Sequence, residues 1–142
     1  MNEKLSSAHS RASVRLFQTA GWLQAEFDNC LRPFGLSAQQ LRVLSLLADE
    51  VGGEATVGTL REGMMDPNSN ISRLLNKLME KGHVEKLRQR DDQRVVSIKI
   101  TSSGRDICAR AQRTLATLDE VWSRLSPGEA DTLAKLLDRL RG

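Results

Sequence analysis

The amino-acid sequence predicts a mainly α-helical fold that carries one small β-hairpin. Residues 66–101 run without a break from an amphipathic helical pattern into two short β-branched segments around a charged tip. Apolar residues at steps of three and four also recur at both ends of the chain, which indicates long amphipathic helices there. The 142 residues suit one domain, so we expect a single domain over residues 1–142.

The helical part of residues 66–101 has a marked start and end. Asp66 is a candidate cap, and Pro67 suits the first helical position, where its missing N–H would have had no partner. Gly82 is expected to end the helix because glycine readily takes a left-handed conformation. One predicted face is apolar, with Ile71, Leu74, Leu75 and Leu78. The opposite face is polar and free of carboxylates up to Glu80, with Asn68, Ser69, Asn70, Ser72, Arg73, Asn76 and Lys77.

That polar face suits the major groove of DNA. Asparagine side chains can read adenine there, and arginine or lysine can read guanine or hold phosphate. The face therefore predicts a recognition helix.

The segments after this helix predict a β-hairpin with a charged tip. Val84 and Leu87 fall in the first strand, and the second strand contains Val95, Val96, Ile98 and Ile100. Guanidinium groups bind phosphate and are attracted to a narrow minor groove. A charged tip can equally be a solvated turn, but its place directly after a polar-faced helix favours DNA contact. The arginines of the tip are Arg88, Arg90 and Arg94.

Two further helices are predicted upstream of the recognition helix. Ser37 is a good cap for a helix over 38–49, and Val51-Gly52-Gly53 should break the chain. Thr56 is expected to cap a short helix from Val57 to about Met64. This short helix and the recognition helix form a helix-turn-helix, and the hairpin makes it a winged helix-turn-helix over residues 37–101.

The terminal helices carry more apolar surface than one winged helix can cover. Residues 9–32 form an amphipathic helix stopped by Pro33, with Leu16, Ala20, Leu23, Phe27 and Leu31 on one stripe. Ser102-Ser103-Gly104 opens a long helix with Ile107, Ala111, Leu115, Leu118, Trp122 and Leu125. Ser126-Pro127 opens a last helix with Leu133, Leu136, Leu137 and Leu140. We expect residues 9–33 and 102–142 to form a dimerisation bundle, the alternative being that these helices pack on their own chain.

Charge is concentrated on the predicted DNA-binding segment. The chain has a formal net charge of +3, while residues 61–105 hold ten Lys or Arg against six Asp or Glu, a net charge of +4. The remaining residues therefore sum to −1, and this distribution is typical of phosphate binding. No stretch approaches the roughly 20 apolar residues of a membrane span, and the start of the chain lacks a secretory apolar segment, so we expect a cytoplasmic protein.

Other classes of function are less well supported. With His9 and His83 as the only histidines and no tyrosine, the chain lacks the residue clusters that catalysis needs, so we expect no enzyme. Cys30 and Cys108 fit no metal-ligand spacing, so we expect no metal or cofactor and two structural thiols. A cysteine-based redox-sensing regulator remains an alternative, because both thiols have basic neighbours in sequence. A winged helix that serves as a protein-interaction module is another.

The order of these elements and five short motifs resemble the MarR family of bacterial transcription regulators over nearly the whole chain. The motifs are Leu36-Ser37-x-x-Gln40-x-x-Val43-Leu44, Gly82-His83-Val84, Asp92-Gln93-Arg94, Ile100-Thr101-Ser102-Ser103-Gly104 and Leu125-Ser126-x-x-Glu129. The resemblance implies that Arg94 enters the minor groove from the wing and that Asp92 orients it. It also implies a pocket for a small-molecule effector between the dimerisation bundle and the winged helix.

Together these observations predict a homodimeric, sequence-specific regulator of transcription. It would be a ligand- or signal-responsive repressor that binds double-stranded DNA at a pseudo-palindromic operator. The predicted DNA-binding residues are Asn68, Ser69, Asn70, Ser72, Arg73, Asn76, Lys77, Arg88, Arg90, Asp92 and Arg94.

Overall fold

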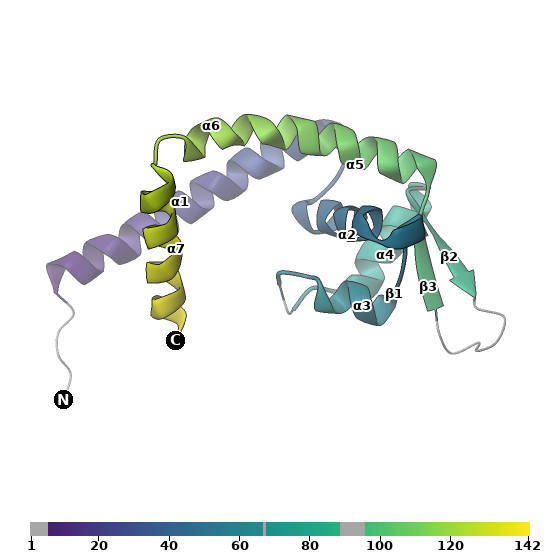
Figure 1. The fold of residues 1–142 in the computed structure, drawn as a ribbon, viewed down its shortest axis with the longest axis horizontal. Helices are drawn as coiled ribbons and strands as arrows, with labels where there is room; N and C mark the ends of the chain where they lie inside the picture. The colour runs from purple at the N-terminus through teal and green to yellow at the C-terminus, as the bar shows by residue number, and fades with distance from the viewer. Residues whose placement is uncertain (1–5, 67, 89–95) are drawn as a thin grey trace.

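The chain folds into a winged helix-turn-helix that lies below a layer of long helices (Figure 1). The computed structural model describes residues 6–66, 68–88 and 96–142. Its elements in chain order are α1 (Ser7–Leu31), η1 (Arg32–Phe34), α2 (Ala38–Asp49), η2 (Val51–Gly53), β1 (Glu54–Thr56), α3 (Val57–Glu62), α4 (Ile71–Glu80), β2 (Val84–Arg88), β3 (Val96–Ile100), α5 (Ser102–Leu115), η3 (Ala116–Leu118), α6 (Asp119–Trp122) and α7 (Pro127–Arg141). The mainly helical fold with a hairpin is therefore confirmed.

Most helices begin where their capping residues predict. Ser37 and Gln40 form a reciprocal capping box at the start of α2, and Ser126 and Glu129 form another at the start of α7. The Thr56 side chain accepts a hydrogen bond from the backbone N–H of Thr59 and caps α3. In each case one side-chain oxygen satisfies a backbone donor that the helix itself leaves without a partner.

The start of α4 differs from the prediction. The helix begins at Ile71, and the Asn70 side chain caps it by accepting from the backbone N–H of Arg73 at 3.1 Å. Asp66 instead accepts from the backbone N–H of Asn68 at 2.9 Å, in a turn before the helix. The expectation that Asp66 caps the helix is therefore wrong, because Asn70 supplies the cap four residues later.

The wing belongs to a three-stranded antiparallel sheet with strand order β1-β3-β2. The predicted hairpin is present, with Val84 opposite Ile100 and Arg88 opposite Val96. β1 was not predicted from the sequence; its three residues pair with β3 from Glu54 opposite Lys99 to Thr56 opposite Ser97. This strand ties the start of α3 to the base of the wing.

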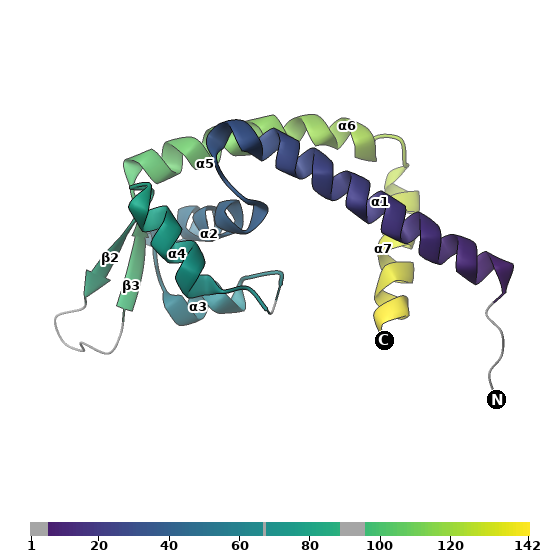
Figure 2. The ribbon, with the colours of Figure 1, turned by 180° about the vertical axis from the view of Figure 1, so that it is seen from behind.

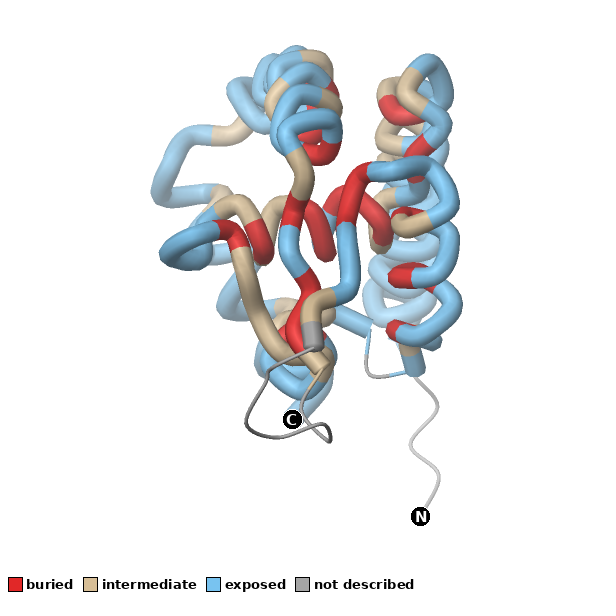
Figure 3. Tube along the Cα trace, turned by 90° about the vertical axis from the view of Figure 1, so that its right-hand side faces the viewer, coloured by how far each residue is buried: buried red, intermediate tan, exposed pale blue. Residues whose placement is uncertain are grey.

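One apolar core joins the helix-turn-helix to the sheet and to α5. Leu44 and Leu47 of α2, Leu78 of α4 and Ile98 of β3 are almost fully buried. Figure 3 shows the buried positions along the inner faces of the helices and on the central strand. The core extends to Leu31, at the end of α1, and to Cys108 and Ala111 of α5.

The long helix predicted after the wing is interrupted. α5 ends at Leu115, and a 3₁₀ turn separates it from α6. The Thr114 hydroxyl donates to the carbonyl of Arg110 at 3.3 Å, and the Thr117 hydroxyl donates to the carbonyl of Thr114 at 2.7 Å. These hydroxyls compete with backbone N–H groups for helix carbonyls, which favours the irregular geometry seen here.

The terminal helices leave much of their apolar surface uncovered within the chain. α1 lies beside α5, as Figures 1 and 2 both show, but Leu31 is its only buried residue. Phe17 on α1 is 79% exposed, and Leu140 on α7 is 71% exposed. α7 has no buried residue. Within the described ranges, no helix is both long enough and apolar enough to cross a bilayer.

Candidate nucleic-acid interface

Helix α4 divides cleanly into a buried face and an exposed face. Its apolar residues pack into the core, and all four are at least nine-tenths buried: Ile71, Leu74, Leu75 and Leu78. Its exposed face carries the four predicted DNA-binding residues that lie within the helix: Ser72, Arg73, Asn76 and Lys77. The buried face fixes the rotation of α4, which Figure 2 shows in front of α2, so these polar side chains are exposed together.

Three other predicted residues lie in the turn before α4 and not on its helical face. Asn68 and Asn70 are exposed, and Ser69 is half-buried. The Ser69 hydroxyl accepts a hydrogen bond from Nε2 of Gln39 at 3.3 Å. The turn thus sits at the N-terminal end of the helix, where the positive end of the helix dipole also points.

The C-terminal end of α4 is closed by Gly82, as the sequence predicts. Gly82 has φ = +76°, and its N–H donates to Met79 at 3.0 Å. The N–H of His83 donates to Leu78 at 2.9 Å, which completes a Schellman motif. Lys81 donates through Nζ to the carbonyl of Gly35, and this contact joins α4 to the segment between α1 and α2.

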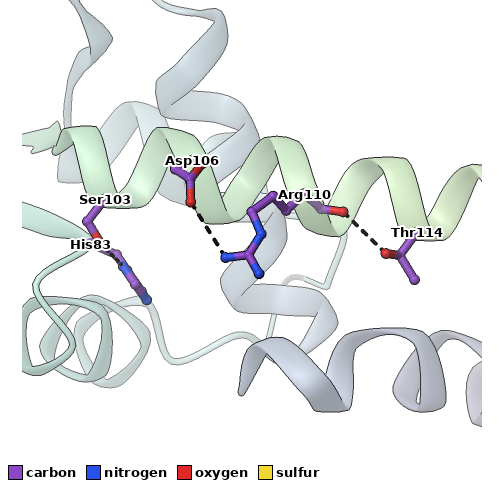
Figure 4. Close-up of polar contacts among 5 residues, drawn as sticks. All are labelled: His83, Ser103, Asp106, Arg110 and Thr114. Atoms are coloured by element: carbon purple, nitrogen blue, oxygen red, sulfur yellow. Dashed lines mark hydrogen bonds and ion pairs between the residues drawn. The ribbon is translucent and has the colours of Figure 1, made fainter.

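A compact junction connects this end of α4 to α5 and to the base of the wing. Thr101, the N-cap of α5, donates from its N–H to the carbonyl of His83 at 3.1 Å and from its hydroxyl to the carbonyl of Gly82 at 2.7 Å. The ring of His83 contacts the Ser103 hydroxyl at 3.0 Å (Figure 4). A Cβ on Gly104 would overlap the His83 carbonyl, so only glycine fits there.

His83 is buried in this junction, and its surroundings favour the neutral ring. Burial lowers the pKa of His83 from its usual value of 6.5, and the positive charge of Lys81 lowers the pKa further. A proton on this ring would place a charge inside the contact between α4 and α5.

The predicted wing residues are only partly within the described structure. Arg88 ends β2, where its backbone pairs with Val96. Arg90, Asp92 and Arg94 lie outside the described residues. Their contacts with DNA stay a prediction.

A hollow of about 420 Å³ lies beside α5 and the 3₁₀ turn that follows it, next to Phe34 of η1. Arg110 borders it, with its guanidinium carbon 5.6 Å from the centre of the Phe34 ring and its NH1 3.6 Å from Asp106 (Figure 4). Arg113, Thr114 and Thr117 complete the lining. The small-molecule effector stays a prediction. Among the described residues no three His, Cys, Asp or Glu side chains come together as metal ligands do.

The environment of Cys108 does not suit a redox sensor. Cys108 is 2% exposed and lies 3.7 Å from the Ser45 hydroxyl. Burial raises the pKa of the Cys108 thiol, and this outweighs the opposite effect of its hydrogen bond with Ser45. A sensor thiol needs exposure and a lowered pKa, so Cys108 is more simply a core residue. Cys30 is a half-buried free thiol.

Helix α2 contributes to this interface in a way that the sequence did not predict. Gln39 reaches Ser69, and Nε of Arg42 donates to the carbonyl of Gly63 at 3.1 Å. Gln39 is half-buried and Arg42 is exposed, and nothing in the sequence pairs them with residues 30 and 21 positions later. Only the packing of α2 against the α3–α4 connection brings them together.

Comparison with known proteins decides the family. The MarR family model matches residues 34–95. The multiple antibiotic resistance protein MarR of Salmonella typhimurium is 30% identical over 115 residues, which cover 80% of this chain and 78% of that protein. The chain belongs to the MarR family.

Solved structures of MarR proteins share the fold along almost the whole chain. AbsC, a MarR family transcriptional regulator from Streptomyces coelicolor, has a TM-score of 0.86 at 19% identity and covers 99% of this chain and 96% of its own. A cysteine-to-serine mutant of MarR from E. coli, solved in complex with operator DNA, has a TM-score of 0.73 at 26% identity. That alignment covers 89% of this chain and 91% of the other. The fold and the family predicted from the sequence are therefore confirmed.

Proposed function

We propose that this MarR-family protein is a homodimeric transcription regulator that binds double-stranded DNA at a pseudo-palindromic operator. The observation that carries the proposal is the exposed face of α4, where Arg73, Asn76 and Lys77 project from a helix anchored by four buried apolar residues. The recognition segment has no carboxylate between Asp66 and Glu80. A polyanion therefore meets hydrogen-bond donors and positive charge along this face.

The proposed docking geometry places α4 in the major groove and the wing beside it. The proposed DNA contacts are Asn68, Ser69 and Asn70 from the turn, Ser72, Arg73, Asn76 and Lys77 from α4, and Arg88, Arg90, Asp92 and Arg94 from the wing. The E. coli MarR mutant described above was solved with operator DNA, which supports the same kind of ligand for this chain. We propose that this binding, and no catalysis, is the activity of the protein, exerted in the cytoplasm.

Dimerisation is proposed from the apolar surface of the terminal helices. Phe17, Leu136 and Leu140 are more than half exposed in the single chain. Large apolar side chains at helical spacing gain free energy when a second copy covers them, by about 1.5 to 3 kcal/mol for each side chain fully buried. We propose that residues 9–33 and 102–142 supply this interface and that residues 37–101 bind DNA.

We propose further that the protein is a repressor whose affinity for DNA responds to a ligand or another signal. Repression needs only occupancy of the DNA by the dimer, which excludes other proteins from the same duplex. The hollow beside Arg110 and Phe34 is the first place to look for an effector.

Sedimentation and DNA titration test this proposal together. The protein should sediment near 32 kDa, twice its 15.8 kDa chain, at micromolar concentration. Phe17→Glu places a charge on the proposed interface and should shift the protein toward monomer, whereas Gln18→Glu on the same helix serves as the control for added charge. A monomeric parent protein, or one that binds a selected duplex no better than random DNA, would contradict the proposal.

A further inference from the structure

The turn that precedes the recognition helix is fastened to α2 at both of its ends. At its start, Nε of Arg42 donates to the carbonyl of Gly63 at 3.1 Å. A Cβ on Gly63 would lie 2.7 Å from Cδ1 of Leu46, so the absence of a side chain lets the turn approach α2 closely. At its end, Nε2 of Gln39 donates to the Ser69 hydroxyl at 3.3 Å. Figure 2 shows the turn running below the N-terminal end of α2.

The contact between Gln39 and Ser69 differs from the other hydrogen bonds at the end of this turn. Asp66 bonds to Asn68, and Asn70 bonds to Arg73, so both of these contacts are local and move with the turn. Gln39 reaches across 30 residues from a helix whose apolar side is packed in the core. It therefore fixes Ser69, and with it the two neighbouring asparagines, relative to the rest of the domain.

We propose that Gln39 is a positioning residue for sequence readout, acting through Ser69 and without contact to a base. The inference rests on the DNA-binding function proposed above. Hydrogen bonds to base edges need donors and acceptors placed to within a fraction of an ångström, whereas attraction to phosphate tolerates a looser arrangement. An uncharged amide that only holds the turn should thus affect the choice of sequence and leave the general affinity for DNA unchanged.

A positioning role and a direct phosphate contact by Gln39 predict different effects on DNA binding. If Gln39 bound a phosphate itself, its loss would weaken binding to every duplex by a similar factor. If Gln39 acts through Ser69, its loss should lower the preference for the selected sequence only. It should also have no effect once the Ser69 hydroxyl has been removed.

A double-mutant cycle tests the inference. The probes are a duplex that the parent protein selects from a random library and a scrambled duplex of the same length and composition. Affinities for both would be measured for the parent, Gln39→Ala, Ser69→Ala and the double variant. Ser45→Ala, also on α2, is the matched control, because the Ser45 hydroxyl accepts a hydrogen bond from Nε2 of Gln112 on α5 at 3.0 Å and not from the turn.

Gln39→Ala should reduce the ratio of selected to scrambled affinity by roughly threefold to tenfold per half-site, the loss expected for one neutral hydrogen bond. The dependence on salt should stay unchanged, and Gln39→Ala should have no further effect in the Ser69→Ala background. An unchanged ratio, an equal loss on both duplexes, or the same loss in both backgrounds would overturn the inference. If the parent prefers no sequence at all, the proposed function fails, and the inference fails with it.

Discussion

The substitution Gly104→Ala probes the junction between the recognition helix and α5. Alanine is the better helix former, and Gly104 is the third residue of α5, so intrinsic propensity predicts a stabilisation of about 0.5 to 1 kcal/mol. The structure predicts the opposite sign. The added methyl group would overlap the backbone carbonyl of His83 and would lie 2.8 Å from Cγ1 of Ile100. The backbone carbonyl cannot rotate away as a flexible side chain could.

To relieve this overlap, the first turn of α5 must move away from the end of α4. That movement weakens the two hydrogen bonds from Thr101 to the carbonyls of Gly82 and His83, each worth about 1 kcal/mol. Overpacking adds about 1 to 3 kcal/mol. After subtraction of the gain in helix propensity, the free energy of unfolding should fall by about 2 to 4 kcal/mol.

Urea unfolding followed by far-ultraviolet circular dichroism measures this change, at one fixed protein concentration because a dimer unfolds in a concentration-dependent way. Gly58→Ala is the matched control. Gly58 is an exposed glycine within α3, and its Cβ would lie 3.9 Å from the nearest heavy atom. This control should be as stable as the parent or slightly more stable. A Gly104→Ala variant as stable as the control would refute the role assigned to the close contact with His83.

Three further outcomes are expected. Because the pKa of His83 is lowered in the folded state, the unfolded chain binds a proton near pH 6.5 while native His83 stays neutral. The free energy of unfolding should therefore fall as the pH drops below 6.5, until native His83 also protonates. Urea titrations at a series of pH values should give a flatter profile for His83→Gln. Arg73→Ala should weaken binding to a selected duplex by about 1 to 3 kcal/mol more than binding to random DNA; equal losses would assign Arg73 to phosphate. Arg94→Ala should lower the slope of log K against log salt by about 1 to 2 for the dimer, and Asp92→Ala should also weaken binding; tighter binding by Asp92→Ala would exclude an orienting role for that carboxylate.

Local chemistry explains why most helix starts could be predicted from the sequence. A capping serine and the residue three positions later satisfy each other's backbone donors, so Ser37 and Ser126 mark their helices without help from the rest of the fold. The start of α4 could not be assigned in the same way, because Asp66 and Asn70 are both good caps. Asn70 takes the role in a structure where Ile71 is buried and Ser69 is held by Gln39.

Other features were missed because they depend on distant partners. β1 is only three residues long, and it forms because its backbone pairs with the edge of β3. The polar face of α4 was predictable because the helical spacing of its apolar and polar residues is visible within ten consecutive residues. The contacts that hold the turn before α4 come from α2, and no local sequence pattern near the turn predicts them.

Selection of bound duplexes from a random library is the most direct test of the central claim, which is that two copies of this winged helix read DNA together. We expect enrichment of a pseudo-palindrome whose half-sites are centred about 10 base pairs apart, one helical turn, so that both copies of α4 enter the major groove on one side of the duplex. Enrichment of a single half-site without symmetry would contradict the dimeric account, and the absence of any enriched sequence would contradict sequence-specific binding itself.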